Sequence, residues 1–188
     1  MTYLPGMAPE IISDASGDDW YTPPWLLAWI GHIALDPCWS AASAVQAAVT
    51  IDLRRGEDGL TTPWEPMLGD GVIFVNPPFS DTAAWLKRCR QESARLRSVV
   101  VVLVPAMAGE TAWASQVWGH AAWVGFFRGR LSFFSPDGRS EPKGRGHALI
   151  IYGPRQAANE VRDRIAGEAR RHPQRPWWVP GNWNLTGE

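Results

Sequence analysis

The sequence predicts a single α/β domain with a mostly parallel central sheet and a late antiparallel hairpin. Segments of strand character alternate with segments of helical character, which favours strand–helix–strand units joined by right-handed crossovers. Residues 99–104 form a continuous apolar run, as expected for a strand that is covered on both faces of a parallel sheet. The length of 188 residues and the hydrophobic share of 45% suit one domain with a substantial core.

Local signals place the elements of this fold in order. Thr22 is a good N-cap and Pro23 a good first helical residue, so a helix should begin there. Pro77 must end the strand before it, because proline cannot donate to a sheet ladder. Helices are expected over residues 25–32, 80–96, 111–120 and 156–171, strands over residues 33–37, 71–75, 99–104, 122–127, 130–135 and 147–152, and a helix leading into a strand over residues 41–51. The last two strands, separated by a turn-rich basic loop, are expected to form the hairpin.

Three regions are expected along the chain. Residues 1–17 lack periodicity and are predicted to be a flexible N-terminus. Residues 18–172 should form the folded domain, and residues 173–188 a tail that contains three prolines and three tryptophans. No internal repeat and no long linker divides the chain into two domains.

Composition narrows the classes of function. The sequence has no apolar run of about eighteen residues and no signal-peptide pattern, so no membrane span is expected. Cys38 and Cys89 indicate reduced thiols in a cytoplasmic protein, and no motif predicts a metal. Residues 1–119 carry 7 basic and 13 acidic side chains, whereas residues 120–188 carry 11 and 6. The basic C-terminal part suits a polyanion, although it can equally be a solvated surface.

The sharpest motif is Asn76-Pro77-Pro78-Phe79, which follows an apolar strand. The Asn76 side-chain oxygen and the Pro77 carbonyl can accept from the two N–H groups of an exocyclic amine, which favours a tetrahedral, more nucleophilic nitrogen. The proline pair holds both acceptors in place, and Phe79 offers a flat face for an extruded base. The pattern resembles the catalytic motif of amino-group methyltransferases. The alternative is a turn that only ends the strand.

Four weaker signals accompany this motif. Asp36 with Pro37 ends a predicted strand and can pair with the positive amino-acid part of a cofactor, although residues 38–43 replace the glycine-rich loop usual in methyltransferases. Asp58, before Gly59, can accept from the adenine or ribose of a cofactor. Trp20, Thr22 and Pro23 form the third group, and Arg128, Arg130, Lys143 and Arg145 form a basic group suited to DNA phosphates. Each also has a purely structural interpretation as a turn, a helix cap or a solvated hairpin.

The order of these motifs resembles the phage-type DNA N-6-adenine methyltransferase (Dam) family over roughly residues 18–153. The resemblance implies a Rossmann-like S-adenosylmethionine-dependent methyltransferase fold and a site-specific, adenine-specific DNA methyltransferase of a bacteriophage or prophage. It would act in the cytoplasm of a bacterial host cell. By motif, Asn76, Pro77, Pro78 and Phe79 would be catalytic, and Trp20, Thr22, Pro23, Asp36, Pro37 and Asp58 would bind S-adenosylmethionine.

The expected reaction is direct methyl transfer from S-adenosylmethionine to the N6 amino group of a flipped adenine in DNA. It needs neither a metal nor a covalent enzyme intermediate, so the two cysteines have no role as nucleophiles. Two alternatives remain open. The same motif serves methylation of RNA or of a glutamine amide in protein, and the altered cofactor loop also fits a catalytically degenerate nucleic-acid-binding protein.

Overall fold

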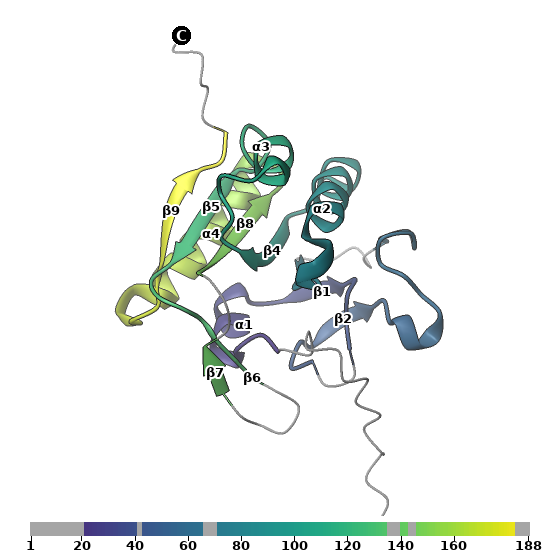
Figure 1. Ribbon diagram of the computed structural model, residues 1–188, viewed down its shortest axis with the longest axis horizontal. Coiled ribbons are helices and arrows are strands. Elements are labelled where there is room, and N and C mark those ends of the chain that lie inside the picture. The colour runs from purple at the N-terminus through teal and green to yellow at the C-terminus, as the bar shows by residue number, and fades with distance from the viewer. Residues whose placement is uncertain (1–20, 41–42, 66–70, 135–139, 143–145, 183–188) are drawn as a thin grey trace, which may run out of the picture.

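One sheet of seven strands forms the centre of the molecule (Figure 1). The structure is a computed structural model, which describes residues 21–40, 43–65, 71–134, 140–142 and 146–182. The strand order is β2-β1-β3-β4-β8-β5-β9. The strands are β1 Ile33–Asp36, β2 Ala47–Thr50, β3 Val72–Val75, β4 Val100–Pro105, β5 Trp123–Phe127, β8 His147–Tyr152 and β9 Pro176–Pro180.

The sheet is mixed, so the expectation of a mostly parallel sheet holds only for its first half. The pairs β1–β2, β1–β3 and β3–β4 are parallel. The pairs β4–β8, β5–β8 and β5–β9 are antiparallel. Because β1, β2, β3, β4 and β5 point the same way, their carboxyl ends share one edge of the sheet with the first residues of β8 and β9. We call this edge the carboxyl edge.

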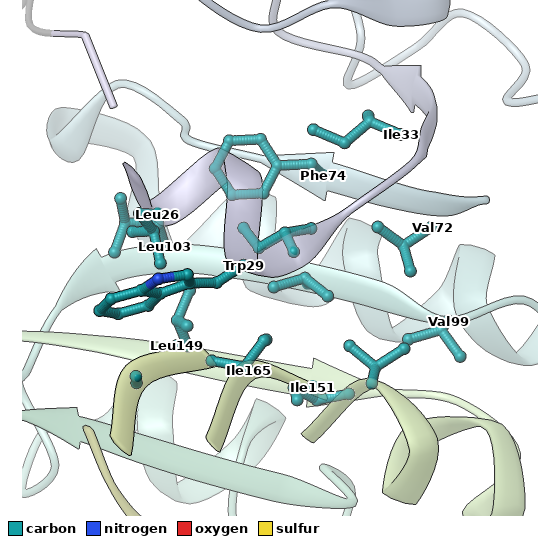
Figure 2. Packing of buried hydrophobic residues seen from close by; sticks show 14 of the residues in the cluster. Leu26, Trp29, Ile33, Val72, Phe74, Val99, Leu103, Leu149, Ile151 and Ile165 are labelled. Atoms are coloured by element: carbon teal, nitrogen blue, oxygen red, sulfur yellow. The ribbon is translucent and has the colours of Figure 1, made fainter. Parts of the chain in front are cut away.

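Helices cover both faces of the sheet. They are α1 Pro24–Ile30, α2 Thr82–Leu96, α3 Thr111–Gln116 and α4 Arg155–Glu168, with the short 3-10 helices η1 Leu53–Arg55, η2 Phe79–Asp81 and η3 Ala169–Arg171. None of the helices within the described ranges is long and apolar enough to cross a membrane. The side chains of β4 alternate between the two faces. Val101 and Leu103 pack with Leu26, Trp29 and Ile165 of α1 and α4 (Figure 2).

The opposite face of β4 carries Val100, Val102 and Val104, which join the cluster of α2 and α3 around Trp85 and Trp113. All six valines and leucines of residues 99–104 are buried. The prediction of a strand covered on both faces is therefore confirmed.

The predicted hairpin is wrong in its pairing. Residues Ser132–Phe134 form β6, which pairs with β7, Ser140–Pro142, in a separate two-stranded sheet. The strand β8 lies instead in the main sheet between β4 and β5. Every residue of β8 is buried, and a strand covered on both faces is better placed inside a layered sheet than in a surface hairpin.

Two further segments differ from expectation. Residues 43–46 are not helical, and the only regular element described within residues 41–51 is β2, with residues 41–42 outside the described part. The strand β9 was not predicted. It packs against Gly125 of β5, where an added Cβ would lie 2.7 Å from the Trp178 ring. A contact between a glycine and a tryptophan on different strands leaves no alternation of apolar residues in the sequence, so β9 could not be predicted from a pattern.

Candidate active site

The motif of residues 76–79 forms a tight turn at the carboxyl edge, directly after β3. The Asp81 amide donates to the Pro78 carbonyl at 3.2 Å. The Thr82 hydroxyl donates to the Phe79 carbonyl at 2.9 Å. The beginning of α2 thus fixes the turn from one side and the buried strand fixes it from the other, which suits a site whose acceptors must be held in place.

A buried carboxylate lies beside this turn. Leu35 of β1 is opposite Ile73 of β3, so Asp36 at the end of β1 adjoins the strand that leads into Asn76. Asp36 is 3% exposed and accepts hydrogen bonds from the Cys38 amide at 3.0 Å and the Cys38 thiol at 3.5 Å. Burial outweighs these bonds and raises the pKa of Asp36 to about 6. Asp36 and Asn76 therefore each follow a strand, as predicted, and the structure shows that the two strands are neighbours.

Cys38 connects the two strand ends. Its thiol donates to Asp36, and the backbone of Asn76 lies within hydrogen-bonding reach of its sulfur. Burial, followed by the charge of Asp36, raises the pKa of Cys38 well above its ordinary value. Because only a thiolate is a good nucleophile, this thiol is a poor one, and its contacts link the ends of β1 and β3.

The loop that carries Asp58 packs directly against the turn after β1. A Cβ at Gly59 would lie 1.9 Å from the Pro37 carbonyl oxygen, so only glycine permits this contact. The indole nitrogen of the buried Trp64 donates to the Gly59 carbonyl at 2.7 Å and anchors the loop. The half-buried Asp58 is thereby brought to the turn that contains Asp36.

A second buried carboxylate, Asp52, follows the neighbouring strand β2 and is 4% exposed. It accepts from the Arg54 amide at 2.9 Å and from the Arg54 guanidinium at 2.7 Å. Hydrogen bonding to Arg54 is the main reason that the pKa of Asp52 is lowered. Asp36, in contrast, forms no ion pair with any residue of the described part. Asp36 is thus the carboxylate that is available to a cationic ligand.

An aromatic cluster of Phe79, Phe133 and His147 begins at the turn of residues 76–79. The Phe79 ring centroid lies 6.3 Å from Phe133 and 5.6 Å from His147, and the latter two rings are 4.8 Å apart. Phe133 and His147 are buried, whereas Phe79 is only half-buried. Phe79 is therefore supported by two buried rings, while part of its side chain remains exposed.

Thr22 lies next to this cluster through a β-bridge between Tyr21 and Phe134, in which the Tyr21 amide donates to the Phe134 carbonyl at 2.8 Å. The prediction that Thr22 caps a helix is wrong, because the N-cap position belongs to Pro23 and no side chain caps it. The Thr22 hydroxyl is buried and has no hydrogen-bond partner within the described residues. A buried hydroxyl without a partner is costly, so it is a candidate to bind a ligand.

Sequence reasoning missed His147. It is the first residue of β8, opposite Pro105, and so reaches the carboxyl edge. Burial lowers the pKa of His147 to about 4, and its Nδ1 atom has no hydrogen-bond partner in the described part of the chain. The histidine at the start of an apolar strand was the available signal. To place His147 at the carboxyl edge from this signal, one must know that β8 is antiparallel to β4, which the sequence does not show.

The predicted basic residues divide between described and undescribed parts. Arg128 and Arg130 are exposed just beyond β5, at the carboxyl edge but three strands away from β3. Lys143, Arg145 and Trp20 lie outside the described residues. No group of three or more histidine, cysteine or acidic side chains in the described ranges can hold a metal ion.

The mixed seven-stranded sheet fits a methyltransferase-like fold, and its Asn-Pro-Pro-Phe turn beside a buried carboxylate is the arrangement expected of an amino-group methyltransferase. The family model of DNA N-6-adenine-methyltransferase (Dam) matches residues 11–164. The chain belongs to this family, which makes it a DNA methyltransferase by family and implies a methyl donor. None of the curated proteins compared with the chain matches it. Residues 165–188, which include η3 and β9, lie beyond the family match.

Proposed function

We propose that the protein transfers a methyl group from S-adenosylmethionine to the N6 amino group of adenine in DNA. The observation that carries this proposal is the placement of Asp36 and Asn76 at the ends of the adjacent parallel strands β1 and β3. A methyl donor held by the first can present its methyl group to a base held by the second. The family assignment supports both the reaction and the substrate.

The residues around Asp36 fit S-adenosylmethionine. Asp36 is a buried carboxylate without a cation among the described residues, and its raised pKa reports the cost of that isolation. The ammonium group of a bound methionine moiety would supply the missing charge. Asp58, in the loop that Gly59 holds against the same turn, would accept from the ribose or adenine of the cofactor. S-adenosylmethionine, when bound, supplies a methyl group on a sulfonium that readily leaves as a thioether.

The turn of residues 76–79 prepares the amine. The Asn76 side-chain oxygen and the Pro77 carbonyl accept from the two N6–H groups, which localises the nitrogen lone pair toward the methyl donor. The nitrogen forms the new bond to the methyl carbon as the carbon–sulfur bond breaks, and the nitrogen then loses one proton to solvent. The exposed part of Phe79 stacks on the base, while Phe133 and His147 keep that ring in position. Base flipping is part of the proposal, because a stacked base cannot reach such a pocket.

Methylation of RNA or of a protein glutamine amide by the same turn is the main competing function. The experiment is methyl transfer from labelled S-adenosylmethionine to separate DNA, RNA and protein fractions, followed by nucleoside and amino-acid analysis. The proposal expects N6-methyladenine from DNA only. Label that appears in RNA or in N5-methylglutamine instead would contradict it.

A nucleic-acid-binding protein that has lost catalysis is the second competing function, since residues 38–43 replace the expected glycine-rich loop. Calorimetric titration with S-adenosylmethionine separates the two. Saturable binding that is lost in Asp36→Ala supports the enzyme. Absence of binding to the wild-type protein, together with retained DNA binding, supports the degenerate protein.

A further inference from the structure

A basic and aromatic surface lies at the far end of the carboxyl edge, outside the site described above. The Gln174 side chain donates to the Arg130 carbonyl and so joins the turn after β5 to the segment between η3 and β9. The Arg128 guanidinium lies 5.1 Å from the centroid of the Trp177 ring. We call this the arginine–tryptophan surface, and its members are Arg128, Arg130, Arg170, Arg171, Arg175 and Trp177.

The side chains of this surface are available to a partner. Its five arginines are exposed, and none forms an ion pair with a described carboxylate. Trp177 is 61% exposed, although large apolar side chains are normally covered. Glu168 is the one acidic side chain in the segment of residues 168–177. Five positive charges on the two chain segments that meet beside an exposed indole match a polyanion that also presents flat apolar groups, which is the chemistry of DNA.

The position of the surface agrees with this partner. β9 begins at Pro176, opposite Phe127, so Trp177 and the arginines lie at the same edge as Asn76. Figure 1 shows the start of β9 and the end of β5 side by side at this edge. Four strand spacings separate β3 from β9, or roughly 19 Å. That span equals roughly five to six base pairs of a duplex.

We propose that the arginine–tryptophan surface binds the DNA duplex that flanks the target base. The arginines contact phosphates, and the indole packs on a sugar of the same strand. This inference rests on the proposed function for the target base. It adds Arg170, Arg171, Arg175 and Trp177 to Arg128 and Arg130, which the sequence alone suggests for DNA phosphates. Four of the six residues lie beyond the part of the chain that the family model matches.

A second copy of the chain is the competing occupant, because β9 is an edge strand. The charge of the surface and the prolines at the two ends of β9 disfavour a second copy. Two exposed patches of five arginines would repel one another, and Pro176 and Pro180 remove backbone donors from a pairing edge.

The test measures binding of the full chain to DNA by fluorescence anisotropy over a series of salt concentrations. Mixed-sequence duplexes of about 24 and about 8 base pairs, each with an adenine at its centre, are compared, since only the longer one extends five to six base pairs beyond that adenine. Arg170→Gln with Arg171→Gln should weaken binding to the long duplex about tenfold or more and lower the salt slope by about 2. Binding to the short duplex should change little. The rate of methylation at saturating DNA should stay at the wild-type value.

The matched control is Lys87→Gln with Arg97→Gln, which removes the same charge from exposed positions in α2 and at its C-terminal end. Trp177→Ala should weaken binding to the long duplex roughly tenfold, whereas Trp177→Phe keeps a flat ring and should retain most of it. Equal weakening in the control pair, or unchanged binding in the Arg170 and Arg171 pair, would overturn the inference. So would a wild-type dimer in sedimentation that Trp177→Ala converts to monomer.

The binding readout separates this inference from the proposed function. A wild-type protein that binds the long duplex through these residues but forms no methyladenine would refute the proposed function and leave the surface standing. If the wild-type protein forms methyladenine in DNA but the substitutions leave DNA affinity unchanged, the proposed function stands and the inference about the surface is refuted.

Discussion

The two halves of the sheet end differently at the same edge. In the parallel half, β1 and β3 each lead into a compact turn. Asp36 at the end of β1 is buried beside the turn of residues 76–79, which follows β3. In the antiparallel half, the end of β5 and the start of β9 lead into exposed arginines, of which Arg128 and Arg175 adjoin the strands. Between these two ends, His147 at the start of β8 is buried.

This difference has a topological cause. Parallel strands are joined by crossovers, so consecutive strand ends meet at one edge and their turns can pack on each other, as those around Pro37 and Gly59 do. Antiparallel strands alternate their ends, and the connections left at this edge run over the surface. The parallel half is thus suited to hold a small ligand and one base, and the antiparallel half to hold the rest of a long substrate.

The substitution with the largest expected effect disrupts the packing between turns in the parallel half. Gly59→Ala would place a methyl group against the Pro37 carbonyl and force the Asp58 loop away from Asp36. We expect the free energy of unfolding to fall by about 3 kcal/mol and cofactor binding to weaken. Urea unfolding and calorimetry measure the two effects.

The control for that prediction is Gly167→Ala in α4, where an added Cβ meets no atom within 4 Å. Alanine is favoured over glycine in a helix, so this variant should be more stable by up to about 1 kcal/mol. If both substitutions have the same small effect, the Gly59 contact does not hold the loop.

Asp36→Asn tests whether this buried carboxylate is kept for a ligand. The folded-state pKa of about 6 lies above the ordinary 3.8, so the folded protein binds more protons than the unfolded chain between these values. Its stability therefore falls as pH rises from about 4 to 6, at a cost of about 3 kcal/mol at pH 7. Asp36→Asn should raise the melting temperature at neutral pH and weaken S-adenosylmethionine binding roughly a hundredfold.

The same pKa predicts how cofactor affinity depends on pH. Only the ionised carboxylate attracts an ammonium group, so wild-type affinity should rise as pH increases through about 6 and level off above it. Asp36→Asn should remove this dependence. A destabilised Asp36→Asn variant with unchanged affinity would show that Asp36 serves the fold alone.

His147 predicts the opposite dependence of stability on pH. Its pKa is about 4 in the folded protein and 6.5 ordinarily, so the unfolded chain gains a proton first as pH falls. Wild-type stability should decline by about 2 kcal/mol between pH 7 and pH 5 relative to His147→Phe. Urea unfolding of both proteins at pH 7 and pH 5 gives the comparison. An equal loss in the two proteins would place His147 in contact with solvent.

The smallest effect concerns a single arginine of the antiparallel half. Arg128→Gln removes one charge and the contact with the Trp177 ring. We expect the slope of DNA affinity against salt to decrease by about 1, with cofactor affinity unchanged. A loss of cofactor affinity in this variant would contradict the division of roles between the two halves.

The sequence predicted the parallel half well because its signals are local. A proline pair ends β3, an apolar run marks β4, and Asp36 and Asn76 each follow a strand. Since parallel strands end at one edge, two such signals are enough to bring both residues together.

The antiparallel half was harder to predict because it depends on pairing between distant segments. The direction of β8 decided that His147 reaches the site, and the contact of Trp178 with Gly125 decided that a proline-rich segment forms β9. Neither leaves a local pattern. Thr22 is a different case. A threonine before a proline predicts a helix cap, but the N-cap is Pro23, and Thr22 follows Tyr21, which forms a β-bridge with Phe134.

The central claim is that two acceptors in the turn after β3 activate the adenine amino group. The most direct measurement is the rate of N6-methyladenine formation in DNA by wild type, Asn76→Ala and Asn76→Asp, with cofactor affinity, DNA affinity and melting temperature measured on each. The account predicts a loss of about a hundredfold or more in Asn76→Ala, with binding and stability close to wild type, and residual activity in Asn76→Asp, which keeps an acceptor oxygen. Wild-type rates of methylation in Asn76→Ala would contradict it.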